Sequence, residues 1–453
     1  MQPEMREEGY SNSGTRSDAE GGDPQGVRWG LGTRIAFRFA FVYFLLYNQF
    51  FPFELLTFPP FLQLSGIYNS LWSETVQWVS RHVLHLSHDF GMDYLNSATG
   101  SKDTTFIYVQ VLCYLVIAAV ATVIWSLLDR GRSNYDWLFK WFLTYMRLAL
   151  AAVMIPYGVA KLFPWQFPAP TLSRLLQTYG DSSPMGLLWT FMGASRSYSF
   201  FGGAAEVLAG MLLVVPRLAT LGALICAGVM SNVLMLNLGY DVPVKSGSIH
   251  LIVMAAIIVA PDLRRLTRFF VLNRRVDPAP TRPLFHRPLL NWLAILLQVA
   301  FGVVLLVYNL YHEDYKTQQV IQARMSAPLY GIWSVDEFKI DGQVRPPLVT
   351  DPIRWNRLIV ESVEEAVVQP MTGGIRHLHL RLDQQNKSFT LTSPYASDWI
   401  AKFTYEDPQP DLLILTGKMG GQPVSATLHK EDASQFLLNS RGFHWIQEFS
   451  VSR

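Results

Sequence analysis

Several ionisable and amide side chains of this 453-residue chain lie within long apolar stretches or at their ends. An unpaired charge at the centre of a bilayer costs at least about 2.5 kcal/mol, so such groups are expected to face a shared polar interior and pair there. A lysine beside a carboxylate can exchange protons with a ligand, or it can be a silent ion pair. We take Lys161 and Glu206 as candidate catalytic residues. The full set is Arg147, Lys161, Glu206, Asn232, Asn237, Asp241, Lys245 and His250.

The composition indicates a membrane protein. Hydrophobic residues make up 50% of the chain and charged residues 16%, whereas about a quarter of a soluble protein is charged. The net charge of +2 gives no reason to expect a nucleic-acid partner. Cys113 and Cys226 form no C-x-x-C pair, which argues against thiol redox chemistry. Histidines 82, 85 and 88 fan across one side of a helix instead of meeting at a point, so we expect no metal site.

Helices that cross a membrane need about 20 apolar residues. Residues 1–30 are polar and lack apolar periodicity, which predicts a disordered cytoplasmic tail with no cleavable signal peptide. The remainder predicts an α-helical membrane domain over 31–311. Its seven expected spans are 33–52, 105–128, 139–163, 198–215, 218–238, 247–263 and 289–311.

Basic residues in the connections predict the orientation. The connection 262–288 contains seven arginines, and the connection after the second span contains Arg130 and Arg132. The alternate connections are poor in Lys and Arg, so the positive-inside rule puts the amino terminus in the cytoplasm and everything after Tyr311 outside it. We expect an integral protein of a bacterial inner membrane.

Two connections on the expected outer side carry patterns of their own. Residues 68–90 place apolar side chains at helical spacing, which predicts a helix lying along the membrane interface. Residues 164–197 contain Trp165, several prolines and a short helical pattern through Trp189 and Phe191. We expect this loop to cover the bundle as a lid and to admit a lipophilic molecule.

Residues 327–453 change character. Short alternating or β-branched runs at 357–362, 376–382, 388–392, 411–416 and 424–429 are separated by Asp-Gly and Gly-Gly turns. They predict a small antiparallel extracytoplasmic β-domain. The sequences Gly331-Ile332-Trp333 and Arg441-Gly442-Phe443 resemble those of lipocalin-like barrels, in which an arginine near the chain end packs on the first-strand tryptophan. Such a barrel is either filled by side chains or holds one small apolar ligand.

The expected orientation places Lys161, Glu206 and the connection 239–246 in the outer half of the membrane. They could converge on one outward-facing pocket, with Gly202, Gly203 and Gly210 permitting close helix approach. Two alternatives stay open: Arg147 as a structural cation, and Asp241 with Lys245 as a solvated salt bridge. The candidate substrate-binding residues are Arg147, Tyr157, Trp165, Asn237, Asp241, Lys245 and His250.

The stretch from Arg147 to Phe163 (RLALAAVMIPYGVAKLF), with Glu206-x-x-x-Gly210 and Pro216-Arg217, resembles the DoxX superfamily of small four-helix membrane proteins. The similar region is about 138–270. The resemblance implies a DoxX-like core associated with electron transfer, since some members are assigned as subunits of a thiosulfate to quinone oxidoreductase. The matching positions are Arg147, Gly158, Lys161 and Glu206. This chain differs from small members in its loop 164–197, its extra amino-terminal spans and its β-domain.

Three functions follow as hypotheses. The first is a quinone-linked oxidoreductase module, in which electrons come through a bound quinone or a redox partner subunit because the chain encodes no redox centre. The second is a binding or transfer protein for a lipophilic molecule, which the β-domain receives or presents. The third is a membrane scaffold that docks a partner through its β-domain.

Overall fold

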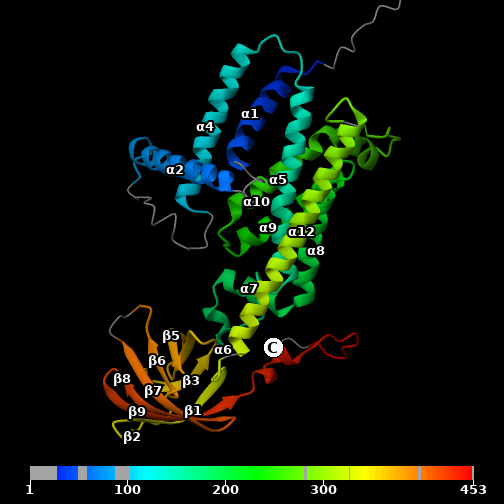
Figure 1. The fold of residues 1–453 in the computed structure, drawn as a ribbon. Helices are drawn as coiled ribbons and strands as arrows, with labels where there is room; N and C mark the ends of the chain where they lie inside the picture. Colours follow the sequence, from blue (N-terminus) through cyan, green and yellow to red (C-terminus); the bar gives the residue numbers. More distant parts are fainter. Residues whose placement is uncertain are drawn as a thin grey trace, which may run out of the picture.

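The structure is a computed structural model that describes residues 28–48, 59–86, 103–279, 283–325, 327–395 and 399–450. A helical bundle occupies one end of the molecule and a β-barrel the other, and the long helix α12 runs between them (Figure 1). The expected disordered tail, 1–30, lies outside the described residues except for 28–30. The expected fold class, an apolar helical bundle followed by a small antiparallel barrel, is confirmed.

Within the described residues, six helical segments are long and apolar enough to cross a membrane, whereas seven were expected. The difference concerns α1 (Leu31–Asn48), which carries Arg34 and Arg38 and is not among the six. The apolar residues at the end of its expected span, 33–52, lie outside the described part of the chain. The six are α4 (Thr105–Leu128), α5 (Asp136–Leu162), α8 (Arg196–Val214), α9 (Ala219–Gly239), the segment Lys245–Val271 and α12 (Pro288–Met325).

The connection between α5 and α8 contains α6 (Leu172–Leu176), η2 (Tyr179–Asp181) and α7 (Pro184–Ala194), which carries Trp189 and Phe191 as expected. The segment Lys245–Val271 consists of α10 (Lys245–Val259), η3 (Ala260–Asp262), α11 (Leu263–Leu266) and η4 (Thr267–Val271). α12 continues well past the expected end of its span at 311, because residues 312–325 include neither glycine nor proline. This polar extension reaches toward the barrel (Figure 1).

Both arginine-bearing connections lie at the end of the bundle remote from the barrel (Figure 1). The Trp29 amide donates to the Ser133 carbonyl at 3.0 Å, which puts the start of α1 beside the connection between α4 and α5. At the same end, the ring of Phe285 contacts that of Trp141 near the start of α5, with centroids 5.6 Å apart. The two basic connections therefore share one end, as the orientation argument requires.

Helix α2 (Pro59–His82) crosses the direction of α1 and α4 (Figure 1). Trp72 and Val76 are buried, and Trp72 packs edge-on against Tyr114 of α4 at 4.6 Å. The expected apolar stripe thus exists along the helix. It ends sooner than expected, because α2 stops at His82 and the side chains of Val83 and Leu86 are exposed. Residues 87–90 of the expected helix lie outside the described residues.

The barrel has eight antiparallel strands in chain order and is closed by pairing between β1 and β9. The two-residue strand β2 pairs antiparallel with the end of β1. Trp333, Phe338, Trp355, Phe389 and Phe403 belong to one continuous hydrophobic core in its interior. The filled interior agrees with the first of the two alternatives for such a barrel. The strands are β1 (Gly331–Ile340), β2 (Gln343–Val344), β3 (Trp355–Val360), β4 (Glu365–Pro370), β5 (Arg376–Asp383), β6 (Ser388–Thr392), β7 (Ile400–Gln409), β8 (Leu412–Met419) and β9 (Gln422–Glu431).

The expected turns connect β1 to β2, β4 to β5 and β8 to β9. Gly420 and Gly421 both have positive φ, at +57° and +88°, which a tight two-residue hairpin requires. The predicted contact between Arg441 and Trp333 is wrong. Trp333 is paired in register with Lys430 of β9, whose ammonium lies 5.4 Å from the indole centroid, whereas Arg441 lies in the exposed segment after the barrel and bonds to Gln447.

Candidate functional site

Lys161 and Glu206 form an ion pair between α5 and α8. The Lys161 ammonium donates to Glu206 Oε2 at 2.6 Å, and the two side chains are 10% and 2% exposed. Lys161 Nζ also lies 3.5 Å from the Tyr157 carbonyl oxygen and 5.7 Å from the centroid of the Tyr157 ring. The two candidate catalytic residues therefore meet, as they must if either is to remain charged among apolar helices.

Glycines bring α5 and α8 together beside this pair. A Cβ atom on Gly158 would meet the Gly203 carbonyl oxygen at 2.7 Å, and one on Gly203 would meet the Gly158 carbonyl oxygen at 2.5 Å. Gly203 also faces the Cβ of Lys161 at 2.9 Å. Close backbone approach of this kind is how small residues pack helices in membranes. The glycines thus fix the separation across which Lys161 reaches Glu206.

His250 is part of a second polar group, between α10 and α1. Its Nε2 lies 2.5 Å from the Tyr43 hydroxyl, and its Nδ1 lies 2.7 Å from the Ser246 carbonyl oxygen. Because a carbonyl can only accept, Nδ1 carries the proton and Nε2 accepts from Tyr43. The ring of Tyr47 stacks on the imidazole at 3.9 Å.

The remaining residues of the connection between α9 and α10 serve its local structure. Asn237 is buried and donates to the Ser248 hydroxyl at 2.8 Å, joining the two helices. The Asp103 carboxylate accepts from the backbone amides of Lys245 and Ser246 at 2.7 and 3.0 Å, and so caps the start of α10. Asn237 therefore orients the helix that carries His250.

Asp241 and Lys245 form an exposed ion pair at 2.8 Å. The hydrogen bond from Lys245, together with its charge, holds the pKa of the Asp241 carboxyl below its usual range. A pair at a solvated rim contributes little to stability. This geometry agrees with the alternative of a solvated salt bridge.

Arg147 does not join the outer group. Its Nε donates to the Leu213 carbonyl at 3.1 Å, in the last turn of α8, and an Nη donates to Gln298 Oε1 of α12 at 2.6 Å. A cation at the carboxyl end of a helix satisfies free carbonyls and opposes the helix dipole. Fourteen residues of helix, about 20 Å, separate it from Lys161. Arg147 thus connects α5, α8 and α12, which agrees with the alternative that it is a structural cation.

Trp165 lies beyond the end of α5, where the Lys316 ammonium of α12 is 5.1 Å from its ring centroid. Its side chain is 44% exposed. It therefore joins the α12 extension to the expected lid. Within the part of the chain that the structure describes, Trp165 makes no hydrogen bond with Lys161 or Glu206.

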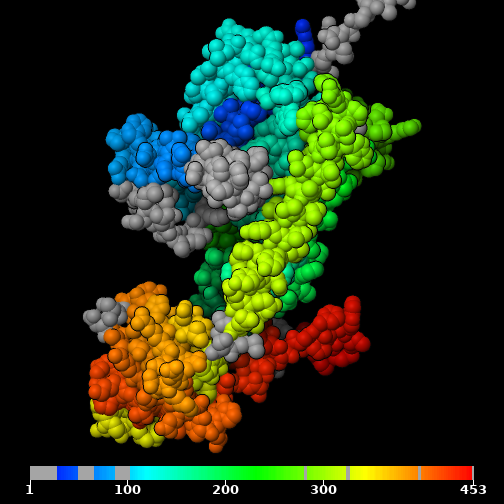
Figure 2. Space-filling model, viewed as in Figure 1, coloured from blue at the N-terminus to red at the C-terminus, as the bar shows by residue number. Residues whose placement is uncertain are grey.

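A cavity of about 1070 Å³ opens between the connection that contains α6 and α7 and the barrel, and it differs from the pocket expected at Lys161 and Glu206. Neither of those residues lines it. Instead the Glu361 carboxylate, at the end of β3, accepts from the amides of Leu172 and Ser173 at 3.3 and 2.7 Å. Beside this contact, Leu172 packs with Ile332, Ile359 and Val367 of the barrel. The lid thus holds the barrel, which lies below the end of α12 (Figure 2).

Sequence reasoning missed Tyr43, Tyr47, Asp103, Arg174 and Glu361. Tyr43 and Tyr47 are four residues apart on α1 and therefore lie on one face of the helix. This spacing could have indicated a polar stripe. Glu361 gave no such signal, because its partners are 188 and 189 residues away in sequence. Within the described ranges, no three His, Cys, Asp or Glu side chains gather as metal ligands; His88 lies outside them.

Comparison with known proteins gives one informative relative. No protein-family model and no solved structure matches the chain. An uncharacterized protein of Bacillus subtilis (strain 168), YwoB, is 34% identical over 141 residues, which are 31% of this chain and 87% of YwoB. The similarity therefore concerns less than a third of this chain but most of its relative. On that identity and coverage, the chain belongs to the same protein family as YwoB.

Proposed function

We propose that the protein is a membrane module that binds a quinone-type lipophilic molecule beside the Lys161–Glu206 pair and exchanges protons with it, working with a redox partner subunit. The observation that carries this proposal is the 2.6 Å ion pair, which is almost fully buried among apolar helices. Ionisable groups inside membranes are costly and usually mark ligand or proton pathways. The DoxX-like motif around Arg147, Gly158, Lys161 and Glu206 supports the same function.

The chemistry assigns distinct roles to the chain and its partner. Reducing a quinone to a quinol takes two electrons and two protons. Lys161 can donate one proton to a quinone oxygen, and Glu206 stabilises the ammonium before that transfer. Water then returns a proton to Lys161, which allows a second transfer to the other quinone oxygen. Tyr157 beside Lys161, and the Tyr43–His250 hydrogen bond between α1 and α10, are further polar groups inside the bundle. The electrons come from the partner subunit.

We also propose how the bundle, the barrel and the lid are placed relative to the membrane. The arginine-bearing end faces the cytoplasm of a bacterial inner membrane, and the lipocalin-like barrel is extracytoplasmic. The lid with Trp165 lies on the outer side, where a lipophilic molecule would enter from the membrane.

Paired substitutions test the proton-exchange role. Glu206→Leu alone should destabilise the protein by about 3–5 kcal/mol, because it leaves the Lys161 charge buried and unpaired. The double variant Lys161→Met with Glu206→Leu should fold like the wild type, yet lose proton uptake coupled to reduction of a short-chain quinone in liposomes. The matched control is Arg265→Met with Asp262→Leu, which removes a 3.0 Å ion pair at the opposite end of the bundle. Wild-type activity in the folded double variant would refute the proposal.

Native mass spectrometry of the purified protein separates the three functions. A co-purifying quinone supports the oxidoreductase module. A lipid without redox chemistry would instead indicate the binding or transfer protein, and a stable protein partner with no small molecule would indicate the scaffold.

A further inference from the structure

The cavity between the lid and the barrel has two walls of different origin. The lid contributes Arg174, Gln177, Met185 and Trp189, and the barrel contributes Glu365 and His377. Its volume of about 1070 Å³ lies at the upper end of the range of small-molecule sites. Because Glu361 fastens α6 to the barrel, both walls are held in place together.

The acidic groups of the cavity are satisfied to different degrees. Glu361 accepts two backbone amides at the start of α6, so its charge has local partners. Asp181 accepts from the Thr178 hydroxyl. Glu365 contacts His377 Nδ1 at 3.1 Å, and its side chain is 53% exposed. Glu365 is therefore open to a ligand, whereas Glu361 is occupied by the amides of α6.

Arg174 supplies positive charge on the opposite wall. Its guanidinium donates to Gln177 Oε1, and no carboxylate of the described residues forms an ion pair with it. It crosses the first turn of α7, where a Cβ on Gly186 would meet its Nη atoms at 2.8 and 2.9 Å. The start of a helix already favours anions, so the guanidinium and the helix reinforce each other.

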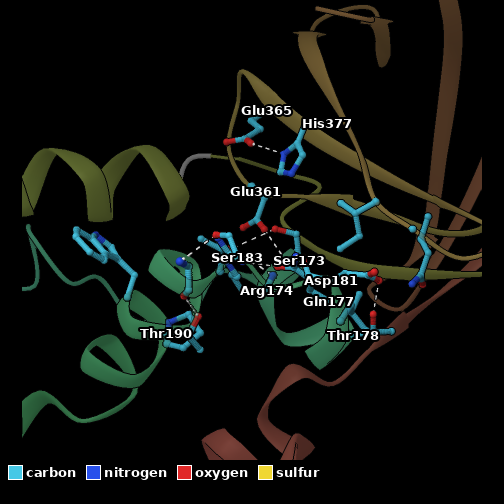
Figure 3. A pocket seen from close by; sticks show the side chains of 18 of the residues that line it. Ser173, Arg174, Gln177, Thr178, Asp181, Ser183, Thr190, Glu361, Glu365 and His377 are labelled. Atoms are coloured by element: carbon cyan, nitrogen blue, oxygen red, sulfur yellow. Dashed lines mark hydrogen bonds and ion pairs between the residues drawn. The ribbon is translucent and has the colours of Figure 1, made fainter. Parts of the chain in front are cut away.

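These charges select a ligand that carries both signs. A simple anion would meet Arg174 but also the carboxylates of Asp181, Glu361 and Glu365. A simple cation would leave the Arg174 charge without an anionic partner. Trp189 lines the same cavity, and an aromatic ring can attract an ammonium group. Figure 3 shows Arg174 on the lid wall and Glu365 with His377 on the barrel wall.

We propose that this cavity binds a small zwitterion, with its anionic group at Arg174 and its ammonium group at Glu365. A phosphate joined to an ammonium group by two carbons, as in phosphoethanolamine, has this chemistry, either as a lipid head group or as a free molecule. The inference is independent of the quinone proposal, because none of its residues belongs to the ion pair in the bundle.

Calorimetric titration of the full chain in nanodiscs of phosphatidylglycerol, which has no amine, tests the site. Glycerophosphoethanolamine should bind saturably, while glycerol 3-phosphate and ethanolamine alone should bind much more weakly. Arg174→Gln and Glu365→Gln should each weaken binding about tenfold. The matched controls Arg196→Gln and Glu364→Gln change exposed residues outside the cavity and should leave binding unchanged.

Further measurements show whether the ligand is a lipid head group or a free molecule, and whether a variant still holds its barrel in place. In nanodiscs that contain phosphatidylethanolamine, loss of apparent affinity for the free molecule indicates that the lipid head group occupies the site, and unchanged affinity indicates a free ligand. Protection of the Leu172 and Ser173 amides from hydrogen exchange reports that a variant keeps the barrel docked. The double variant of Lys161 and Glu206 should bind normally. Absence of glycerophosphoethanolamine binding, equal binding of glycerol 3-phosphate, or equal loss in the controls would overturn the proposal.

Discussion

At the scale of residues, the groups that contact a charged side chain determine its role. Lys161 and Glu206 neutralise each other, Arg147 bonds a helix-terminal carbonyl, and the Arg354 guanidinium is buried in the barrel. Arg354 donates to the carbonyls of Arg345, Trp355, Val335 and Asp336, and so replaces bonds that water would otherwise make. Residue type alone does not separate these roles, because each depends on the groups that the fold brings beside the charge.

Asp351 makes the stability of the barrel depend on pH. Burial alone would raise the pKa of this carboxyl, but the amides of Ile353 and Arg354 and the Arg345 guanidinium outweigh burial and hold the pKa below its usual range. A carboxyl with a lowered folded-state pKa stabilises the fold above its unfolded pKa of about 3.9, and this contribution is lost as pH falls through the lower folded value. Asp351→Asn should therefore be less stable than wild type at pH 7.

Unfolding of the barrel followed by tryptophan fluorescence between pH 7 and pH 2 measures this contribution. The stability difference between Asp351→Asn and the wild type should shrink below about pH 4, as the wild-type carboxyl takes up its proton. Asp411→Asn, in an exposed turn, is the control. A difference that stays constant over the whole pH range would contradict the assignment.

At the scale of elements, small residues set the distances at which helices meet. Gly158 and Gly203 bring α5 and α8 into backbone contact, and Gly222 packs against α8 from α9, where a Cβ would meet the Leu213 amide at 2.8 Å. The ion pair depends on the first of these contacts. Helix length also follows a local cause, since α12 continues to Met325 through residues 312–325, which include neither glycine nor proline.

Neighbouring glycines allow a test of this packing. Gly203→Ala would put a Cβ 2.5 Å from the Gly158 carbonyl oxygen, so we expect a loss of about 1–3 kcal/mol as α8 moves away. Gly202→Ala points into open space and should change stability by less than about 0.5 kcal/mol. Thermal unfolding in detergent gives both values. Equal effects of the two substitutions would show that the contact does not hold the helices together.

At the scale of the whole molecule, the lid connects two units of different chemistry. The bundle presents apolar helices suited to contact with membrane lipid, and the barrel has a filled interior. α6 meets the barrel through Glu361 and Leu172, so the connection 164–197 covers the barrel junction as well as the bundle. A ligand at the junction cavity would touch both units.

Cysteine labelling tests how this arrangement sits in the membrane. In intact cells, Tyr395→Cys on the exposed barrel surface should react with a membrane-impermeant maleimide, whereas Arg275→Cys should react after permeabilisation. The native Cys113 and Cys226 are buried, which keeps the background low, and the unsubstituted protein is the control. Labelling of Arg275→Cys from outside would reverse the proposed orientation.

Local pattern accounts for much of the architecture. Apolar run length located α4, α5, α8, α9, α10 and α12, and alternation with turn signals located five of the strands. The strands β2, β4 and β7 were not located. β2 has two residues, β4 (EAVVQP) does not alternate and ends in a proline, and β7 carries charged residues and a proline toward its end. Lys161 and Glu206 could be selected because a charge in an apolar run is anomalous whatever its partner.

The sequence by itself determined the element types, the membrane character and the presence of buried charges, because these depend on periodicity, length and the cost of desolvation. Tertiary structure decided which groups meet. It brought Lys161 into an ion pair with Glu206, and it brought His250 and Glu361 into hydrogen bonds with Tyr43 and with the start of α6. It also separated Arg147 from the outer site and put the cavity at the barrel. Pairings between residues 45 to 207 positions apart depend on how helices and barrel pack, which no local pattern encodes.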